Sequence, residues 1–198
     1  MHMEAGQASD RPAHHATEDS VRGRHNPGTD RHLKAMLSQV PDILWAPIVV
    51  AGLVVTIGVL GVLFNQPWLF ASLGPTAYLI AHTPEQPAAA FYNAVVGHLV
   101  AVASAFLVVD IMGADNAPSL FVTHQLVGIR VFASALALGL AILGELLLRA
   151  SHPPAAATVL LITLGGFSVS VHSATTIMAG VLFLALLGEP LRRIRTRA

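Results

Sequence analysis

The sequence predicts an all-α fold in which a polytopic bundle of transmembrane helices forms one membrane domain. Of the 198 residues, 54% are hydrophobic and only 11% are charged, whereas roughly a quarter of the residues are charged in soluble domains. The charges are also sparse in the middle of the chain. Between residues 44 and 188 the formally charged residues are Glu85, Asp110, Asp115, Arg130, Glu145 and Arg149. Apolar runs of this length are typical of helices that cross a bilayer.

Composition and motifs exclude several classes of function. The chain has no cysteine, so it forms no disulfide and offers no thiolate metal ligand. Its formal net charge of zero argues against a nucleic-acid-binding protein. G-x-S-x-G, H-E-x-x-H and Walker-type motifs are missing from the sequence, and the histidines of the apolar region lack the spacing of metal ligands on one helix face. We therefore expect neither an enzyme nor a bound metal or cofactor.

Hydropathy divides the chain into three parts. Residues 1–43 are polar and predict a disordered cytoplasmic tail, residues 44–189 form the predicted membrane domain, and residues 190–198 form a basic cytoplasmic end. Within the membrane domain, apolar runs predict helices over residues 44–64, 91–109 and 129–148, each about long enough to span a bilayer. The run over residues 67–81 is shorter and contains Gly74-Pro75, which predicts a discontinuous or re-entrant helix.

The stretch over residues 151–157, Ser-His-Pro-Pro-Ala-Ala-Ala, predicts a second break. Two consecutive prolines end an arriving helix but suit the first turn of a new one, so we expect a helix to begin at Pro153 or Pro154. The uncharged residues 155–188 would make one helix of about 50 Å, too long for a single span. We expect a division near Gly165-Gly166 or within residues 168–173, which leaves two short spans.

The two broken segments resemble each other. Residues 72–77, Ser-Leu-Gly-Pro-Thr-Ala, align with residues 151–156 and share Ser, Pro and Ala at the same spacing. Because each lies between apolar runs, we predict two inverted three-helix repeats with six crossings; four crossings with two re-entrant segments are the alternative. The N–H groups of residues 76–78 and 155–157, at the two helix starts, would then be free to hold a small anion.

Charges near the ends of the runs predict orientation. Basic residues flank the membrane domain on both sides, so we expect both termini in the cytoplasm and an even number of crossings. In a prokaryote the membrane would be the inner, or plasma, membrane. Arg130 and Glu145 lie near the two ends of one run, where long side chains reach water. Glu145 is also four residues from Arg149 and could pair with it.

Polar side chains within the apolar runs are further candidates for a site. A histidine at membrane depth is costly and therefore indicates function, which singles out His98 and His152, with Asn93 in the same run as His98. The structural alternative is that these histidines form hydrogen bonds between helices. We expect no carboxylate beside either histidine.

Three short motifs together resemble the HPP family of integral membrane proteins. They are His152-Pro153-Pro154, residues 72–77 and Gly97-His98-Leu99, and the resemblance covers residues 44–188. The family often has Pro-Arg-Asn shortly before Gly-His, whereas here Asn93 stands without the arginine, which bears on the identity of the substrate. Plant plastid and cyanobacterial members have been linked to nitrite transport, so the resemblance implies a membrane protein that transports nitrite.

These observations lead to two hypotheses. The first is a permease for a small inorganic anion such as nitrite, which binds the anion at the broken-helix starts. The second is a non-transporting membrane scaffold or sensor, in which the proline stretch is only a packing kink. Expected partners are the lipid bilayer, the anion and, because small residues suit helix contacts, a second copy of the chain. The predicted anion-binding residues are Ser72, Gly74, Pro75, Thr76, Asn93, His98, Ser151, His152, Pro153, Pro154 and Ala155.

Overall fold

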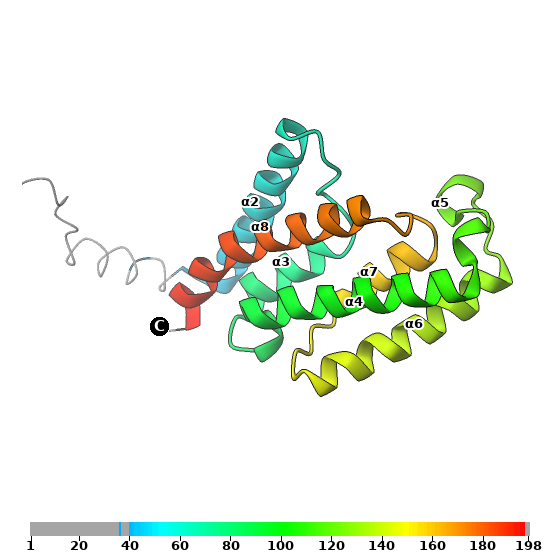
Figure 1. Ribbon diagram of the computed structural model, residues 1–198. Helices are drawn as coiled ribbons and strands as arrows, with labels where there is room; N and C mark the ends of the chain where they lie inside the picture. Colours follow the sequence, from blue (N-terminus) through cyan, green and yellow to red (C-terminus); the bar gives the residue numbers. More distant parts are fainter. Residues whose placement is uncertain (1–35, 37–39, 197–198) are drawn as a thin grey trace, which may run out of the picture.

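The structure, a computed structural model, describes residue 36 and residues 40–196, so most of the polar segment over residues 1–43 lies outside it. In this part of the chain the regular elements are helices, without strands, which confirms the predicted all-α class. The α-helices, labelled as in Figure 1, are α2 (Asp42–Leu63), α3 (Leu73–His82), α4 (Phe91–Met112), α5 (Leu120–Thr123), α6 (Gly128–Leu147), α7 (Ala155–Thr163) and α8 (Val171–Thr196). Two short 3₁₀ turns, η1 (Pro87–Ala89) and η2 (Ala114–Asn116), lie before and after α4.

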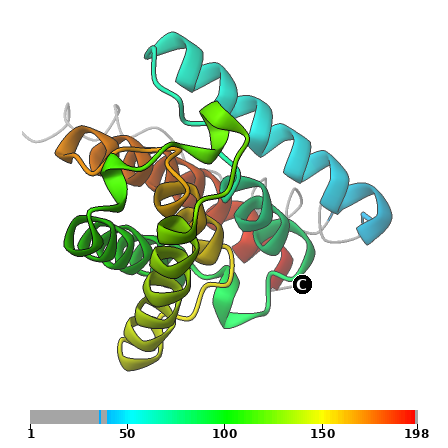
Figure 2. The ribbon, with the colours of Figure 1, turned by 90° about the vertical axis from the view of Figure 1, so that its right-hand side faces the viewer.

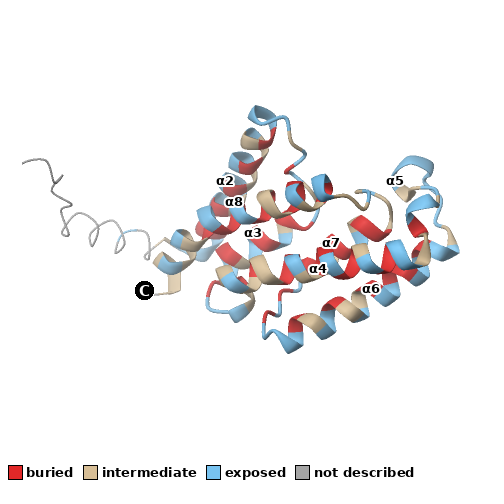
Figure 3. Cartoon of the chain, viewed as in Figure 1, coloured by how far each residue is buried: buried red, intermediate tan, exposed pale blue. Residues whose placement is uncertain are grey.

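The helices α2, α4, α6 and α8 are long and apolar enough to cross a membrane. They contain between 20 and 26 residues each, which corresponds to about 30–39 Å of helix and matches a hydrocarbon core of about 30 Å. Large apolar side chains are exposed on their outward faces, drawn pale blue in Figure 3. The protein is therefore a membrane protein with several apolar helices, whose outward faces contact the lipid bilayer.

The helices α3 and α7 are short, as the breaks in the sequence predict. They contain 10 and 9 residues, or about 15 Å of helix, which is roughly half of the hydrocarbon core. The long apolar run after residue 155 is divided between residues 163 and 171, at the predicted place. The last helix is longer than predicted, because α8 continues through Pro190 to Thr196.

The short helices lie between the long ones (Figures 1 and 2). α3 packs against α2 and α8, and α7 packs against α6 and α4, while α4 also lies beside α6 and α8. Small residues let α4 and α6 approach closely: a Cβ added to Gly144 would come within 2.7 Å of Val100 Cγ1. Fully buried alanines on these two helices are Ala101, Ala105, Ala133 and Ala137.

The start of α2 and the end of α8 lie together. The Arg195 guanidinium forms an ion pair with the Asp42 carboxylate, and its Cζ lies 5.5 Å from the ring centroid of Trp45. The first and last described helices therefore begin and end at the same end of the bundle. This agrees with termini that share one side of the membrane, and the cytoplasmic side stays a prediction.

Arg130, at the start of α6, is buried, so the prediction that it reaches water was wrong. Its side chain is 2% exposed, and its guanidinium donates three hydrogen bonds to main-chain carbonyls. Nε donates to Pro118 at 2.7 Å, Nη1 to Thr163 at 2.8 Å and Nη2 to Ala117 at 2.7 Å. The Thr163 carbonyl belongs to the last turn of α7, where carbonyls lack helical partners. Arg130 thereby connects the segment before α5 to the end of α7.

Candidate functional site

The start of α7 does not present the free N–H groups that the sequence predicts. The helix begins at Ala155, and its N-cap residue Pro154 already has helical dihedral angles, with φ −59° and ψ −24°. The N–H groups of residues 155–157 donate to the carbonyls of residues 152–154, at distances of 2.9 to 3.1 Å. A helix does follow the proline pair, one residue later than predicted, but tight turns use its first donors locally.

The start of α3 differs from the prediction in the same way. The helix begins at Leu73, two residues before Pro75, and Ser72 is its N-cap residue. The Thr76 N–H donates to the Ser72 carbonyl at 3.3 Å, and residues 77–78 lie beyond the first turn. Neither short helix therefore leaves the predicted N–H groups free, so the prediction of free main-chain donors at the two helix starts is wrong.

Buried polar side chains gather instead where the two short helices meet. They come from the first residues of α3 and the residue before it, from α4, from the turn before α7 and from α7 itself. We call this set the polar cluster: Ser72, Thr76, His98, His152 and Thr158, each with an exposed fraction of 0%. Because water does not reach these groups, they depend on one another and on nearby carbonyls for hydrogen bonds.

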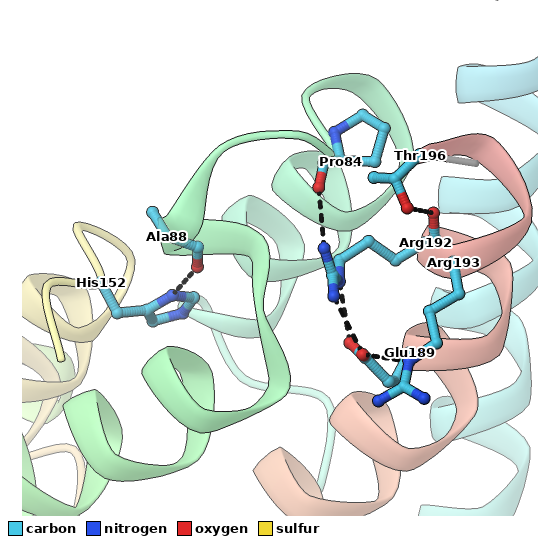
Figure 4. A network of polar contacts seen from close by, with 7 residues as sticks. All are labelled: Pro84, Ala88, His152, Glu189, Arg192, Arg193 and Thr196. Carbon is cyan, nitrogen blue, oxygen red and sulfur yellow. Dashed lines mark hydrogen bonds and ion pairs between the residues drawn. The ribbon is translucent and has the colours of Figure 1, made fainter. Parts of the chain in front are cut away.

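His152 is hydrogen-bonded through both ring nitrogens. Its Nδ1 lies 2.7 Å from the Ala88 carbonyl oxygen (Figure 4), and its Nε2 lies 3.1 Å from Thr76 Oγ1. Because a carbonyl oxygen only accepts, Nδ1 carries a proton. In the neutral ring Nε2 is then an acceptor, and the Thr76 hydroxyl can donate either to it or to the Ser72 carbonyl.

The segment between α3 and α4 that contains Ala88 is held from two sides (Figure 4). His152 binds it from the side of α7, and Arg192 of α8 donates to the Pro84 carbonyl at 3.1 Å. Arg192 also binds both carboxylate oxygens of Glu189, at 2.8 and 2.9 Å. The acceptor of His152 is thus fixed in place by the last helix.

Hydroxyl groups connect α7 to α3. Ser72 Oγ lies 2.7 Å from Thr158 Oγ1, and Thr76 Oγ1 lies 2.9 Å from the Ser72 carbonyl. The hydroxyl proton of Thr76 therefore has two acceptors within reach, this carbonyl and the ring of His152. Polar contacts run without interruption from α7, through the start of α3, to the proline stretch.

His98 of α4 has one bonded and one unpartnered ring nitrogen. Its Nδ1 donates to the Ala94 carbonyl, one turn earlier, at 2.8 Å. Its Nε2 is buried and has no hydrogen-bond partner in the described part of the chain. The ring centroid lies 4.9 Å from that of His152, with an interplanar angle of 49°. Because an unpartnered buried polar atom is costly, Nε2 of His98 is a candidate position for a hydrogen bond with a ligand.

Contacts with α4 and α6 hold residues 148–154, which we call the proline turn. Gly97 of α4 lets the chain pass closely, since an added Cβ would lie 2.6 Å from His152 Cβ. Asn93 Nδ2 donates to the Ser151 carbonyl at 3.0 Å, and Glu145 Oε2 accepts the N–H of His152 at 3.1 Å. The Gly-His pair of α4 thus has two roles, because glycine admits the turn and His98 contacts its histidine.

Three predictions that concern Glu145 were wrong. It is 8% exposed and therefore does not extend to water, and its carboxylate lies beside His152, where no carboxylate was expected. Arg149 follows the end of α6 with a φ of 52° and is exposed, and no ion pair joins it to Glu145. Glu145, Ser151 and His152 instead line a largely apolar pocket of about 260 Å³ between α6 and α7.

The predicted site residues fall into two groups. Ser72, Thr76, His98 and His152 come together in the polar cluster. The others lie around it: Gly74 is half-buried, Pro75, Ser151 and Pro153 are exposed, Asn93 binds only the main chain of the proline turn, and Pro154 and Ala155 are buried at the start of α7. The functional role of each residue stays a prediction.

Two residues of this region escaped sequence reasoning. Thr158 lies four residues after Pro154, so helical periodicity could have placed it on the same face of α7. Ala88 contributes only its carbonyl oxygen, which carries no sequence signal. In the described part of the chain, no three His, Cys, Asp or Glu side chains form a group that could hold a metal ion.

Comparison with known families decides where the chain belongs. A family model described as "HPP, transmembrane region" matches residues 36–197, which include all three motifs that carry the resemblance. The chain belongs to the HPP transmembrane family. No curated protein and no solved structure matches it. In this HPP protein the histidine of the His-Pro-Pro motif belongs to the polar cluster, while the two prolines directly precede α7.

Proposed function

We propose that this HPP protein is a permease that carries a small inorganic anion, such as nitrite, across the membrane. The observation that carries the proposal is the unpartnered Nε2 of His98, fully buried beside His152 where the two short helices meet. Polar groups within a membrane domain are expensive to bury and mark substrate pathways. A permease needs such groups, because they replace the water that surrounds an anion in solution.

The chemistry of the polar cluster favours an anion. The hydroxyl groups of Ser72, Thr76 and Thr158 donate hydrogen bonds, and a protonated histidine donates through both ring nitrogens. Since the main chain at the starts of α3 and α7 is occupied by local hydrogen bonds, side chains hold the anion in this proposal. Nitrite is the anion that the family resemblance implies.

The helix arrangement supports a transporter made of two inverted repeats. Each half contains a long, a short and a long helix: α2, α3 and α4, then α6, α7 and α8. Each short helix packs against the first helix of its own half and the last helix of the other half, which is the reciprocal pairing of elements related by a two-fold axis. In this proposal each short helix, with its flanking non-helical residues, completes a crossing, so the chain crosses six times.

Orientation and energetics constrain the mechanism. In this proposal both termini lie in the cytoplasm, because the arginines at the end of α8 favour that side by the positive-inside rule. Moving one negative charge into a cell that is negative inside costs about 2.3 kcal/mol per 100 mV. Uptake therefore requires a coupled proton or a steep anion gradient, whereas export proceeds passively.

Two serine variants test whether the polar cluster is the transport site. Ser72→Ala removes a buried hydroxyl from the cluster, and we expect anion flux in proteoliposomes to fall about five- to tenfold, which corresponds to one lost hydrogen bond. Ser168→Ala is the matched control, because Ser168 is exposed and lies outside the polar cluster, and we expect flux within about twofold of the native chain.

Equal flux in the two variants would contradict this location of the site. The scaffold or sensor hypothesis predicts a different result, because it expects no protein-dependent flux from the native chain.

A further inference from the structure

We propose that the anion and one proton bind together at His98, so that transport is a 1:1 symport without net charge movement. This inference rests on the proposed permease function and specifies its coupling ion. Three observations carry it: the hydrogen bond of Nδ1, the unpartnered Nε2, and the ring of His152 at 4.9 Å.

The hydrogen bonds of the His98 ring decide in which protonation state Nε2 can bind an anion. Nδ1 faces the Ala94 carbonyl at 2.8 Å, and a carbonyl only accepts, so Nδ1 carries a proton. In the neutral ring Nε2 is therefore a bare acceptor, which repels an anion. Nε2 donates to an anion only when it carries a second proton, so a bound anion at this atom requires a protonated ring.

His98 and His152 differ in whether Nε2 is open to an anion. Both ring nitrogens of His152 already have partners, because Nδ1 donates to the Ala88 carbonyl and Nε2 shares a hydrogen bond with Thr76 Oγ1. If Nε2 is protonated, it donates to Thr76 Oγ1 while the Thr76 hydroxyl donates to the Ser72 carbonyl, so Nε2 of His152 is occupied in either protonation state and is not open to an anion. His98 gains a hydrogen bond with the anion when it takes the proton, and it loses none.

The ionisable groups around His98 decide how many protons bind with the anion. On the elements around α4, the ring of His152 lies beside the ring of His98, and the carboxylate of Glu145 accepts the main-chain N–H of His152. α8 carries its ionisable residues near its two ends, and α7 carries none. Because two imidazolium rings 4.9 Å apart repel each other, the pair binds one proton beyond the Nδ1 protons of the neutral rings. The stoichiometry is therefore one proton per anion.

The proton balance is the same for either form of the substrate. An anion and a proton arriving separately leave Nε2 protonated and bonded to the anion. A neutral weak acid donates its own proton to Nε2 and becomes the same pair. On release the proton leaves Nε2 with the anion, and the ring returns to its neutral form.

The test measures nitrite accumulation in proteoliposomes that contain the full chain, with the membrane potential clamped at zero and protein-free vesicles as the correction for diffusion of the neutral acid. For the native chain, an imposed gradient of about one pH unit, acid outside, should accumulate nitrite about tenfold. An imposed potential at equal pH should drive no net flux.

His98→Gln is the decisive variant, because the glutamine amide supplies a permanent donor near the position of Nε2 and does not titrate. We expect accumulation driven by the pH gradient to vanish, while flux becomes sensitive to membrane potential. His172→Gln is the matched control at an exposed position in α8, and it should accumulate nitrite like the native chain.

Two results would overturn the inference while leaving the permease proposal intact. The first is native flux that follows the potential and ignores the pH gradient, a measurement that needs no variant. The second is tenfold accumulation by His98→Gln. The absence of any native flux would instead overturn the permease proposal itself.

Discussion

Replacement of Arg130 by lysine is expected to lower the free energy of unfolding by about 1–3 kcal/mol, the usual cost of a buried carbonyl that loses its donor, because the hydrogen bond to the Thr163 carbonyl is buried. The guanidinium reaches three carbonyls, of Ala117, Pro118 and Thr163, from one planar group. A lysine ammonium is a single point on a flexible stem and does not reproduce that fork. Denaturant or thermal unfolding of the detergent-solubilised protein measures the difference.

Arg149→Lys is the matched control for this substitution. Arg149 is exposed after the end of α6, so the same change should alter the free energy of unfolding by no more than about 0.5 kcal/mol. If Arg130→Lys were as stable as Arg149→Lys, the three hydrogen bonds would not stabilise the connection between α7 and the segment before α5.

Gly97→Ala is expected to destabilise the protein by about 1–3 kcal/mol, the usual cost of overpacking, and to lower anion flux. The added Cβ would lie 2.6 Å from His152 Cβ and 3.2 Å from the Ala150 carbonyl oxygen. His152 cannot yield easily, because its ring is bonded at both nitrogens. The proline turn must therefore move away from α4, and unfolding and flux measurements on one preparation detect both effects.

Gly139→Ala provides the comparison for helix propensity alone. Gly139 lies within α6 with no atom within 4 Å of an added Cβ, so alanine there should stabilise the protein by up to about 1 kcal/mol. A Gly97→Ala variant as stable as Gly139→Ala would show that close approach of the turn is not required.

The positions of the helices were largely predictable from the sequence. The predicted runs over residues 44–64 and 91–109 correspond to α2 and α4 within three residues at each end, because a span requires a continuous apolar length. The breaks at α3 and α7 followed from proline and glycine, whose effects on the backbone are local. The reciprocal packing of the two halves consists of contacts between helices that are far apart in the sequence. The sequence supported it only through the weak repeat between residues 72–77 and 151–156.

Site residues could be predicted where a polar side chain interrupts an apolar run, because burying such a side chain in a membrane is costly. His98 and His152 stood out because polar side chains are rare in apolar runs, and both belong to the polar cluster. The prediction of free N–H groups at the helix starts was wrong, because these groups donate to carbonyls a few residues earlier at the starts of α3 and α7. The burial of Arg130 was also missed, because its acceptors lie on segments remote in sequence.

Anion flux into proteoliposomes, for the native chain and for His152→Ala, tests the permease proposal most directly. Nitrite, nitrate, formate and chloride are compared, with pH gradients imposed in both directions. The proposal predicts selective flux for the native chain and its loss in the variant, because His152 connects the proline turn to α3 through Thr76. The proposal would be contradicted if proteoliposomes with the native chain took up none of these anions faster than protein-free vesicles. It would also be contradicted if the His152→Ala variant carried anions as fast as the native chain.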